Sequence, residues 1–332
     1  MRILIPNQML PTERYAALTD AGHQLVFGRP LGDRRPFEDG ELARLVRDAD
    51  GVLSTNLPGT AMQGADRLRA VIAQSIGYER IDVEAATSLG VLVCNSPAEE
   101  NFTGVAEATV GLAMALSKRL KHNEALVRGG GWYTEADLGS VLKGRTYGVV
   151  GLGRTGGAVI ERLRGWGMRL LACDPYVSPE KAAALGVELV DLPTILGEAD
   201  CLSLHVPVTD ETRNMIGEAE LQAMKPTAFL INIARGPVLD EAAFCRAITE
   251  RWIAGGALDV FVQEPLPHDS PLHGLDPERV ILTPHDLAQS PESRAGGFRM
   301  SLESMLAALA GRVPEPVVNP EAIPAWRRRF GP

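Results

Sequence analysis

A glycine-rich hexapeptide constrains the fold of this chain more than any other segment. Residues 151–156 read Gly-Leu-Gly-Arg-Thr-Gly, follow an apolar run at 147–150 and open a segment with helical spacing. A second apolar run leads into Asp174, eighteen residues after the last glycine. Glycine-rich turns are common, but this order of strand, turn, helix, strand and acidic residue is typical of a dinucleotide-binding βαβ unit.

Each glycine of the motif has a physical role in such a unit. Gly151 permits the tight turn, Gly153 lets the backbone approach a pyrophosphate, and Gly156 lets the helix pack closely on the strand. The pyrophosphate then lies at the positive end of the helix dipole, against unpaired N–H groups. The residues of this unit that we expect to contact the dinucleotide are Gly151, Gly153, Arg154, Thr155, Gly156 and Asp174.

Asp174 predicts the kind of dinucleotide. Its carboxylate is placed to accept hydrogen bonds from the adenosine ribose hydroxyls, and it would repel a 2′-phosphate. The next residues, Pro175 and Tyr176, provide no arginine that would reverse this preference. The sequence therefore predicts NAD rather than NADP. The alternative, in which the glycines serve only a tight strand–helix turn, is disfavoured by the acidic residue in register.

Short apolar runs alternate with helical segments along the chain, which predicts parallel sheets covered by helices. In the first hundred residues the runs of strand length are 2–5, 24–27, 51–54, 70–73 and 91–93. In the second series they are 147–150, 168–173, 187–190, 201–205, 229–233, 257–260 and 280–282. Helical segments are expected at 41–47, 82–89, 101–128 and 292–310.

The length of 332 residues exceeds the usual size of a single core, so two domains are expected. We predict an α/β protein with two doubly wound parallel-sheet domains. A Rossmann NAD-binding domain at 101–287 is inserted into a flavodoxin-like substrate-binding domain made of 1–100 and 288–332. The final helix, at about 292–310, is long enough to return the chain to the outer domain.

Composition excludes several classes of protein. The formal net charge of −9 disfavours a nucleic-acid partner, and no apolar segment has the length that a membrane span needs. The four cysteines are irregularly spaced, show no metal-site pattern and indicate reduced thiols in a cytoplasmic protein. Arg327, Arg328 and Arg329 form one basic cluster, which we interpret as a solvated tail in preference to a polyanion site.

Three charged or titratable residues follow predicted strands of the second series. Arg235 comes after the run at 229–233, Glu264 after 257–260 and His285 after 280–282. Because ligands of an open α/β sheet bind beyond the carboxyl ends of its strands, we expect all three at one edge. Singly, each has a structural explanation as a turn, a surface loop or a core histidine. Together, downstream of a dinucleotide motif, they indicate a catalytic set.

The chemistry of these three residues suits hydride transfer at C2 of a small 2-hydroxy acid or its 2-keto partner. A histidine such as His285 can take the hydroxyl proton during oxidation and return it during reduction. Glu264 beside it favours the charged imidazolium. The forked donors of Arg235 can grip the substrate carboxylate and polarise the carbonyl. No metal is required.

Five segments resemble the D-isomer-specific 2-hydroxyacid dehydrogenase family, and the resemblance covers most of the chain. These segments are 144–154, 205–213, 232–241, 258–266 and 283–285. The resemblance implies that Arg235, Glu264 and His285 are catalytic, that Val206 and Pro207 lie near the cofactor, and that Asp259 contacts the nicotinamide amide. It also matches Ser75, Ile76 and Gly77 to a carboxylate-binding loop whose backbone N–H groups form an anion nest.

The chain departs from the family pattern at several positions. Ser75 stands where glycine is common, and Asp286 and Gln289 follow His285 where apolar and small residues are usual. Asp286 is expected either to bind a hydroxyl or amine of the substrate or to cap the next helix, and the cap is the preferred interpretation. The resemblance implies a homodimer with an arm at about 120–138. There Trp132 and Tyr133 either fill the interface, which we prefer, or reach the partner's active site.

The leading hypothesis is an enzyme that reduces a glyoxylate- or hydroxypyruvate-like 2-keto acid, or oxidises the matching D-2-hydroxy acid. A phosphite-type dehydrogenase on the same fold is one alternative, and an NAD-sensing binding protein similar to corepressors is another. A formate-type enzyme is disfavoured, because glutamine typically replaces Glu264 there. The expected partners are a small acid substrate and a second copy of the chain, with neither nucleic acid nor membrane.

Overall fold

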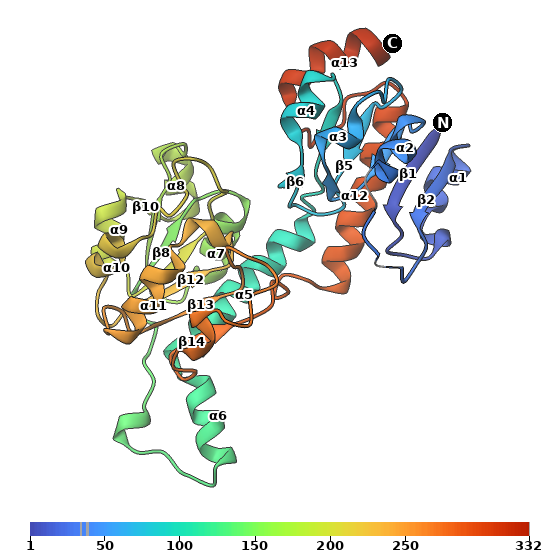
Figure 1. Ribbon diagram of the computed structural model, residues 1–332. Helices are drawn as coiled ribbons and strands as arrows, with labels where there is room; N and C mark the ends of the chain where they lie inside the picture. Colours follow the sequence, from blue (N-terminus) through green and yellow to red (C-terminus); the bar gives the residue numbers. More distant parts are fainter. Residues whose placement is uncertain (34, 38–39, 332) are drawn as a thin grey trace. The chain divides into compact units, whose positions relative to one another are not determined.

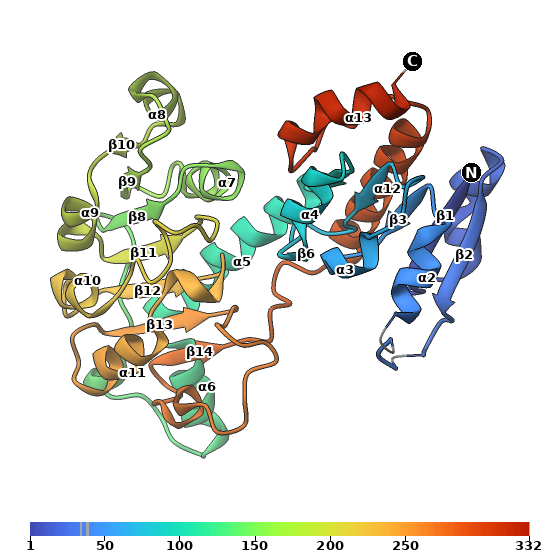
Figure 2. The same cartoon turned by 45° about the horizontal axis from the view of Figure 1, so that its top comes forward.

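The structure, a computed structural model, describes residues 1–33, 35–37 and 40–331. The chain divides into two compact units, Met1–Asn101 with Pro291–Pro332, and Phe102–Ser290. Each unit is built around a parallel β-sheet (Figures 1 and 2). Among the helices of the described chain, none has the length and apolar character needed to span a bilayer.

The first unit has a five-stranded sheet in the order β2-β1-β3-β5-β7, the order of flavodoxin-like folds. Its strands are β1 (Arg2–Asn7), β2 (Gln24–Arg29), β3 (Gly51–Leu53), β5 (Ala70–Ile72) and β7 (Leu92–Cys94), and β4 (Asn56–Leu57) pairs with β6 (Arg80–Ile81) in a small second sheet. Its helices are η1 (Thr12–Tyr15), α1 (Ala16–Asp20), α2 (Glu41–Arg47), α3 (Gly59–Met62), α4 (Val83–Ser88), α12 (Pro291–Leu309), η5 (Pro320–Ala322) and α13 (Ile323–Phe330).

The packing of the first unit follows from its apolar strands. One buried cluster joins one face of the sheet to α1, α12 and α13, and another joins the opposite face to α2, α3 and α4. Both faces are covered, so the strand sequences are continuous apolar runs rather than alternating ones. α4 begins where Asp82 caps it, with Asp82 Oδ1 accepting from the N–H of Ala85 at 2.9 Å.

The second unit has a seven-stranded parallel sheet in the order β10-β9-β8-β11-β12-β13-β14, the Rossmann arrangement (Figure 2). Its strands are β8 (Thr146–Val150), β9 (Arg169–Cys173), β10 (Glu188–Leu189), β11 (Cys201–Leu204), β12 (Phe229–Asn232), β13 (Gly255–Leu258) and β14 (Val280–Leu282). Its helices are α5 (Glu99–Ser117), α6 (Leu120–Arg128), η2 (Glu135–Asp137), α7 (Arg154–Leu163), α8 (Pro179–Leu185), α9 (Leu192–Glu198), α10 (Glu218–Ala223), η3 (Gly236–Val238), α11 (Glu241–Thr249) and η4 (Pro271–Gly274). One face packs on α9, α10 and α11, and the other on α5, α7 and α8.

The prediction of one helical stretch at 101–128 is wrong in one respect, because the stretch is two helices. α5 ends at Ser117, α6 begins at Leu120, and Arg119 between them has a φ of 49°. A residue with left-handed backbone geometry interrupts the i to i+4 hydrogen-bond ladder. The boundary between the two units falls within α5.

The arginines at 327–329 are exposed, as predicted for a solvated basic cluster, but they lie in a helix on the first unit rather than in a tail. The helix predicted at 292–310 is α12, but α13 follows it and contains the arginine cluster. Trp326 of α13 is fully buried, and its ring N–H donates to the carbonyl oxygen of Arg69 at 2.8 Å. Arg329 stacks on Phe330 and donates to the carbonyl oxygen of Asp66 at 2.7 Å. These contacts hold the segment on the first unit.

The strand predicted at 257–260 lies two residues earlier, at Gly255–Leu258. Two glycines begin it, which in sequence resemble a loop. A side chain at Gly255 would come within 2.3 Å of the carbonyl oxygen of Arg279, and one at Gly256 within 2.7 Å of that of Leu230. Glycine therefore lets neighbouring backbone approach this central strand closely.

Candidate functional site

The glycine motif forms the turn between β8 and α7. Gly151 has a φ of 93°, and a side chain at Gly156 would come within 2.0 Å of the carbonyl oxygen of Gly151. By contrast, no described atom lies within 4 Å of the place that a side chain at Gly153 would take. α7 has no side-chain cap from the described residues, and it begins with Arg154 and Thr155. This open, uncapped helix terminus fits the pyrophosphate of a dinucleotide.

Asp174 follows β9 and holds the glycine turn. Its Oδ2 accepts from the N–H of Leu152 at 2.8 Å, and its Oδ1 accepts from the N–H of Tyr176 at 2.9 Å. Each carboxylate oxygen has a second lone pair, so both can also accept ribose hydroxyls. The structure therefore places Asp174 at the turn, as a ribose-binding residue requires.

Val206 and Pro207 follow β11, beside β8. A side chain at Gly151 would come within 2.9 Å of Val206 Cγ1, which places Val206 against the turn. The carbonyl oxygen of Pro207 accepts from Thr212 Oγ1 at 2.6 Å, and this bond fixes the loop after the strand. Except for Asp259, which follows β13, the residues predicted to bind the dinucleotide thus come together at the carboxyl edge of β8, β9 and β11.

His205 is a buried histidine beside the same turn, and motif reasoning assigned it no role. Its ring Nε2 lies 2.9 Å from Ser203 Oγ, and its Nδ1 is buried without a partner among the described residues. Burial lowers the pKa of His205 to about 4. The ring is therefore neutral at neutral pH and adds no charge next to the cofactor-binding turn.

Glu264 and His285 form a hydrogen-bonded pair. His285 Nδ1 lies 2.8 Å from Glu264 Oε2, and Glu264 Oε1 accepts from the N–H of Phe261 at 3.0 Å. Both oxygens of the carboxylate are therefore held. Because Nδ1 faces Glu264, Nε2 is the ring nitrogen placed to exchange a proton with a substrate. The His285 side chain is 44% exposed, so a small molecule can reach it.

A backbone contact brings the turn that contains Arg235 against the loop that carries Glu264. The side chain of Asn232, the last residue of β12, closes the following turn by donating to the carbonyl oxygen of Arg235 at 3.0 Å. The next residue, Gly236, packs directly on Phe261, because a side chain there would come within 1.9 Å of the Phe261 carbonyl carbon. Since Phe261 also binds Glu264, the Arg235 turn lies against the loop that carries Glu264.

Asp259, one residue after β13, anchors the backbone around His285. Its Oδ1 accepts from Thr283 Oγ1 at 2.7 Å and from the N–H of Asp286 at 3.2 Å, which flank His285 on both sides. His285 itself has a φ of 55°, an uncommon left-handed geometry for a residue other than glycine. Burial raises the pKa of Asp259, while the hydrogen bond from Thr283 and the charge of His285 oppose the shift.

The loop at Ser75, Ile76 and Gly77 belongs to the first unit and follows β5. Ser75 Oγ donates to the carbonyl oxygen of Gly77 at 3.0 Å, and Asn95 Nδ2 donates to that of Ile76 at 2.9 Å. None of the three residues has a positive φ, so serine is accommodated where the family commonly has glycine. Within the described chain, their backbone N–H groups form no backbone–backbone hydrogen bond.

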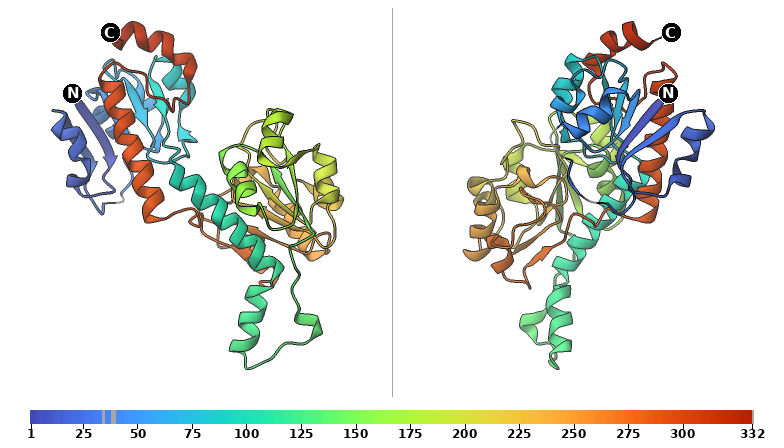
Figure 3. Two further views of the ribbon diagram at one scale, coloured as in Figure 1. Left: turned by 180° about the vertical axis from the view of Figure 1, so that it is seen from behind. Right: turned by 45° about the vertical axis from the view of Figure 1, so that its right-hand side comes forward.

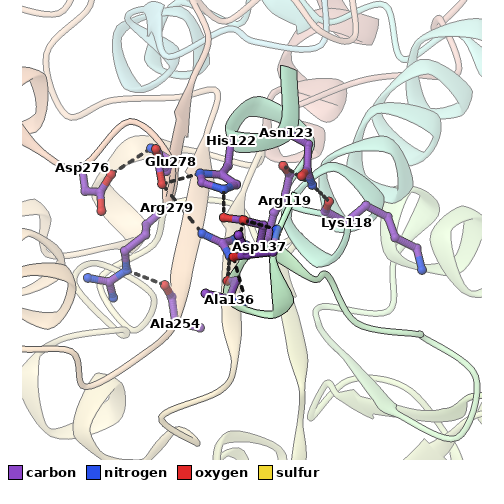
Figure 4. Close-up of polar contacts among 11 residues, drawn as sticks. Lys118, Arg119, His122, Asn123, Ala136, Asp137, Ala254, Asp276, Glu278 and Arg279 are labelled. Atoms are coloured by element: carbon purple, nitrogen blue, oxygen red, sulfur yellow. Dashed lines mark hydrogen bonds and ion pairs between the residues drawn. The ribbon is translucent and has the colours of Figure 1, made fainter. Parts of the chain in front are cut away.

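Residues 119–141 form an arm that extends away from the seven-stranded sheet of its unit (Figures 1 and 3). At its base His122 lies between two carboxylates (Figure 4). His122 Nε2 is 2.6 Å from Asp137 Oδ1. His122 Nδ1 is 2.7 Å from Glu278 Oε2, but this second contact does not have the geometry of a hydrogen bond. Hydrogen bonds from Thr134, with that from His122, lower the pKa of Asp137 to about 2. The cluster ties α6, the returning arm and the segment before β14 together.

Several large apolar side chains of the arm are exposed. Trp132 is 75% exposed, and its ring lies 6.2 Å from that of Tyr133. The other exposed large apolar residues of the arm are Leu120, Val127, Leu138 and Val141. An apolar surface on a projecting arm is typical of a protein–protein contact.

Sequence reasoning did not identify the residues that assemble the site. Asn232, Gly236 and Thr283 each act through a backbone or side-chain contact with a distant segment. Gly236 carried the only sequence signal, since it directly follows Arg235 in a short turn. In the described part of the chain, no group of three His, Cys, Asp or Glu side chains is arranged to hold a metal ion.

Comparisons with known proteins place this geometry in a family. A family model described as "D-isomer specific 2-hydroxyacid dehydrogenase, NAD binding domain" matches residues 110–286. The chain is 40% identical to a glyoxylate reductase of Korarchaeum cryptofilum over 88% of this chain and 89% of that protein. It is 38% identical to a D-3-phosphoglycerate dehydrogenase of Methanocaldococcus jannaschii, over 86% of this chain and 54% of that longer protein.

The fold is also found in solved structures. The crystal structure of the TT0316 protein from Thermus thermophilus matches with a TM-score of 0.83 and 31% identity, over 96% of this chain and all of that one. Sequence and fold agree along nearly the whole chain, and the family model covers the seven-stranded unit with its dinucleotide turn. The chain belongs to the D-isomer specific 2-hydroxyacid dehydrogenase family, whose NAD-binding domain it contains.

Proposed function

We propose that this protein uses NADH to reduce a short 2-keto acid of the glyoxylate or hydroxypyruvate type to the D-2-hydroxy acid, and catalyses the reverse oxidation. The Glu264–His285 hydrogen bond carries the proposal, because it presents an exposed imidazole at the sheet edge that also holds the dinucleotide turn. Relatives named glyoxylate reductase, 36–40% identical over most of the chain, support this substrate class.

Bound NADH supplies the hydride for C2 of the keto acid. His285 Nε2 donates a proton to the keto oxygen during reduction and accepts it during oxidation. Glu264 stabilises the charged imidazolium and fixes the ring through Nδ1. Arg235 binds the substrate carboxylate and polarises the carbonyl. The backbone N–H groups of Ser75, Ile76 and Gly77 give the carboxylate a second anchor; these residue roles are part of the proposal.

Different residues are proposed to bind the pyrophosphate, the adenosine ribose and the nicotinamide of NAD. Gly151, Gly153, Arg154, Thr155 and Gly156 receive the pyrophosphate, and Asp174 receives the adenosine ribose. Val206 and Pro207 line the neighbouring turn, and Asp259 receives the nicotinamide amide. We assign cofactor binding to a domain of about 101–287 and substrate binding to 1–100 with 288–332. NADPH should be a much poorer donor, since Asp174 repels a 2′-phosphate.

A panel of short 2-keto acids, read by the loss of NADH absorbance, tests this function. We expect turnover of at least one keto acid with NADH, little with NADPH, and none in a His285→Ala variant that still binds NADH. Phosphite and formate are tested in the oxidative direction. Turnover of phosphite alone would support the phosphite-type alternative, and NADH binding without turnover of any substrate would support an NAD-sensing binding protein.

We also propose that the protein is a homodimer built on the arm, residues 119–141. The exposed Trp132, Tyr133, Leu138 and Val141 supply the apolar surface, and the polar cluster around His122 keeps it in one conformation (Figure 4). Trp132 and Tyr133 either fill this interface or reach the active site of the partner subunit, and we prefer the first interpretation.

A cytoplasmic location stays a prediction that rests on four free cysteines.

A further inference from the structure

The residue after His285 carries a negative charge with no partner in the described chain. Asp286 is exposed, and its carboxylate accepts no hydrogen bond and forms no ion pair with any described residue. The preferred sequence interpretation, a helix cap, is wrong because α12 begins only at Pro291. Instead the carbonyl oxygen of Asp286 accepts from the N–H of Gln289 at 2.8 Å in a turn.

The backbone of Asp286 is fixed, so its charge stays close to His285. Asp259 Oδ1 accepts from the backbone N–H of Asp286 at 3.2 Å and from Thr283 Oγ1 at 2.7 Å, so the loop is anchored on both sides of the histidine. Neighbouring Cα atoms are about 3.8 Å apart, which keeps the carboxylate within about 10 Å of the imidazole. In the proposed function the reacting carbon of the substrate lies at that imidazole.

The local charges favour a substrate with a single negative group. In the proposed function Arg235 matches the one carboxylate that every 2-keto acid carries, and His285 serves the keto oxygen. The segment after the histidine, Asp286-Leu287-Ala288-Gln289, adds no cation that would match a second one. A phosphate or carboxylate in the substrate tail would therefore be repelled by the carboxylate of Asp286. The distance between the two charges is comparable with the Debye length in physiological salt, so the salt screens this repulsion only in part.

We propose that Asp286 is a specificity-determining residue that disfavours 2-keto acids whose tail carries a second negative charge. The inference rests on the proposed function and deepens it. The chain is similar both to glyoxylate reductases and to D-3-phosphoglycerate dehydrogenases. Asp286 separates these two substrate types in favour of an uncharged tail, such as a hydrogen atom or a hydroxymethyl group.

The test compares kcat/KM for glyoxylate, hydroxypyruvate and 3-phosphohydroxypyruvate in four proteins: wild type, Asp286→Asn, Asp286→Glu and Glu250→Gln. Asp286→Asn should raise kcat/KM for the phosphorylated acid about tenfold and leave that for glyoxylate within about threefold. Asp286→Glu should behave as wild type. Glu250 is an exposed acid at the C-terminal end of α11, at the opposite edge of the sheet, so its removal should change neither value.

Measuring the same kcat/KM values at higher salt concentration distinguishes an effect of the Asp286 charge from an effect of its shape. It should narrow the preference of the wild type for glyoxylate over the phosphorylated acid, because screening weakens the repulsion, and should have little effect on Asp286→Asn. An unchanged substrate ratio in Asp286→Asn would overturn the inference while leaving the proposed function intact. Failure of the wild type to consume any of the three acids would instead overturn the proposed function, and this inference with it.

Discussion

At the scale of single residues, the carboxylate of Glu264 makes two contacts that hold the site together. One oxygen accepts from Phe261 and the other holds His285. Glu264→Gln keeps the shape of the side chain but removes the charge that stabilises the imidazolium. We expect kcat for keto-acid reduction to fall about 100-fold, with the KM for NADH little changed. Initial-rate measurements of NADH consumption at saturating keto acid give both values.

Glu241 provides a matched control for this variant. Its Oε1 accepts from the N–H of Val262 at 2.7 Å, so it binds the same loop as Glu264 but does not contact His285. Glu241→Gln should keep most of the activity. An equal loss of kcat in both variants would show that order in the loop, rather than the charge beside His285, limits the reaction.

His205 makes the stability of the fold depend on pH. Burial lowers its pKa from 6.5 to about 4, so between these values the unfolded ring binds a proton that the native ring does not. Its contribution to the free energy of unfolding is complete above about pH 6.5 and is lost as the pH falls towards 4, by at most about 3 kcal/mol. Calorimetry should show a Tm that falls less steeply in acid for His205→Gln than for wild type. Identical slopes, together with an NMR titration of the native ring near 6.5, would contradict this prediction.

At the scale of elements, one glycine decides whether two loops meet. A side chain at Gly236 would come within 1.9 Å of the Phe261 carbonyl carbon, so Gly236→Ala forces the Arg235 turn away from the loop of Glu264. We expect a stability loss of about 1–3 kcal/mol and a large fall in kcat/KM. Gly197→Ala is the control, because no described atom lies within 4 Å of its new side chain in α9. Its Tm should not fall, since alanine favours a helix by up to about 1 kcal/mol over glycine. Full activity in Gly236→Ala would contradict the contact.

Most strands of the two main sheets could be predicted because they are short apolar runs whose side chains are buried on both faces of a sheet. The errors occur where local sequence carries no signal. Arg119 adopts a left-handed φ between α5 and α6 without a glycine or proline to announce it. α13 was missed because its arginines resemble a tail, whereas burial of Trp326 depends on a sheet far away in the sequence. The strand at Gly255–Leu258 was predicted two residues too late, because the close approach of Arg279 to Gly255 is a tertiary contact.

The candidate site divides in the same way. The rule that ligands bind at the carboxyl ends of parallel strands predicted that Arg235, Glu264 and His285 lie at one edge of the sheet, without any contact being known. The anchoring of His285 by Asp259 required the structure, because it joins the ends of β13 and β14 through side chains. The sequence thus predicts which residues lie at the carboxyl edge of the sheet, and tertiary packing determines which contacts orient their side chains.

At the scale of the whole molecule, the exposed apolar residues of the arm predict that the protein forms a dimer. Trp132 and Leu138 are largely exposed, whereas the polar cluster around His122 fixes the base of the arm and keeps these side chains presented. Burying them in a dimer removes apolar area from water, and large aromatic residues of this kind often dominate interface energies. The double variant Trp132→Ser, Leu138→Ser should raise the dimer dissociation constant at least about 100-fold.

Tyr176 provides the control for this last prediction, since it is 84% exposed and lies outside the arm. Tyr176→Ser removes a comparable exposed aromatic ring and should leave the dimer intact, because the contact depends on position rather than on surface hydrophobicity in general. Sedimentation velocity at micromolar protein distinguishes the species. A wild type that sediments as a monomer, or a double variant that stays dimeric, would show that the arm does not form the interface.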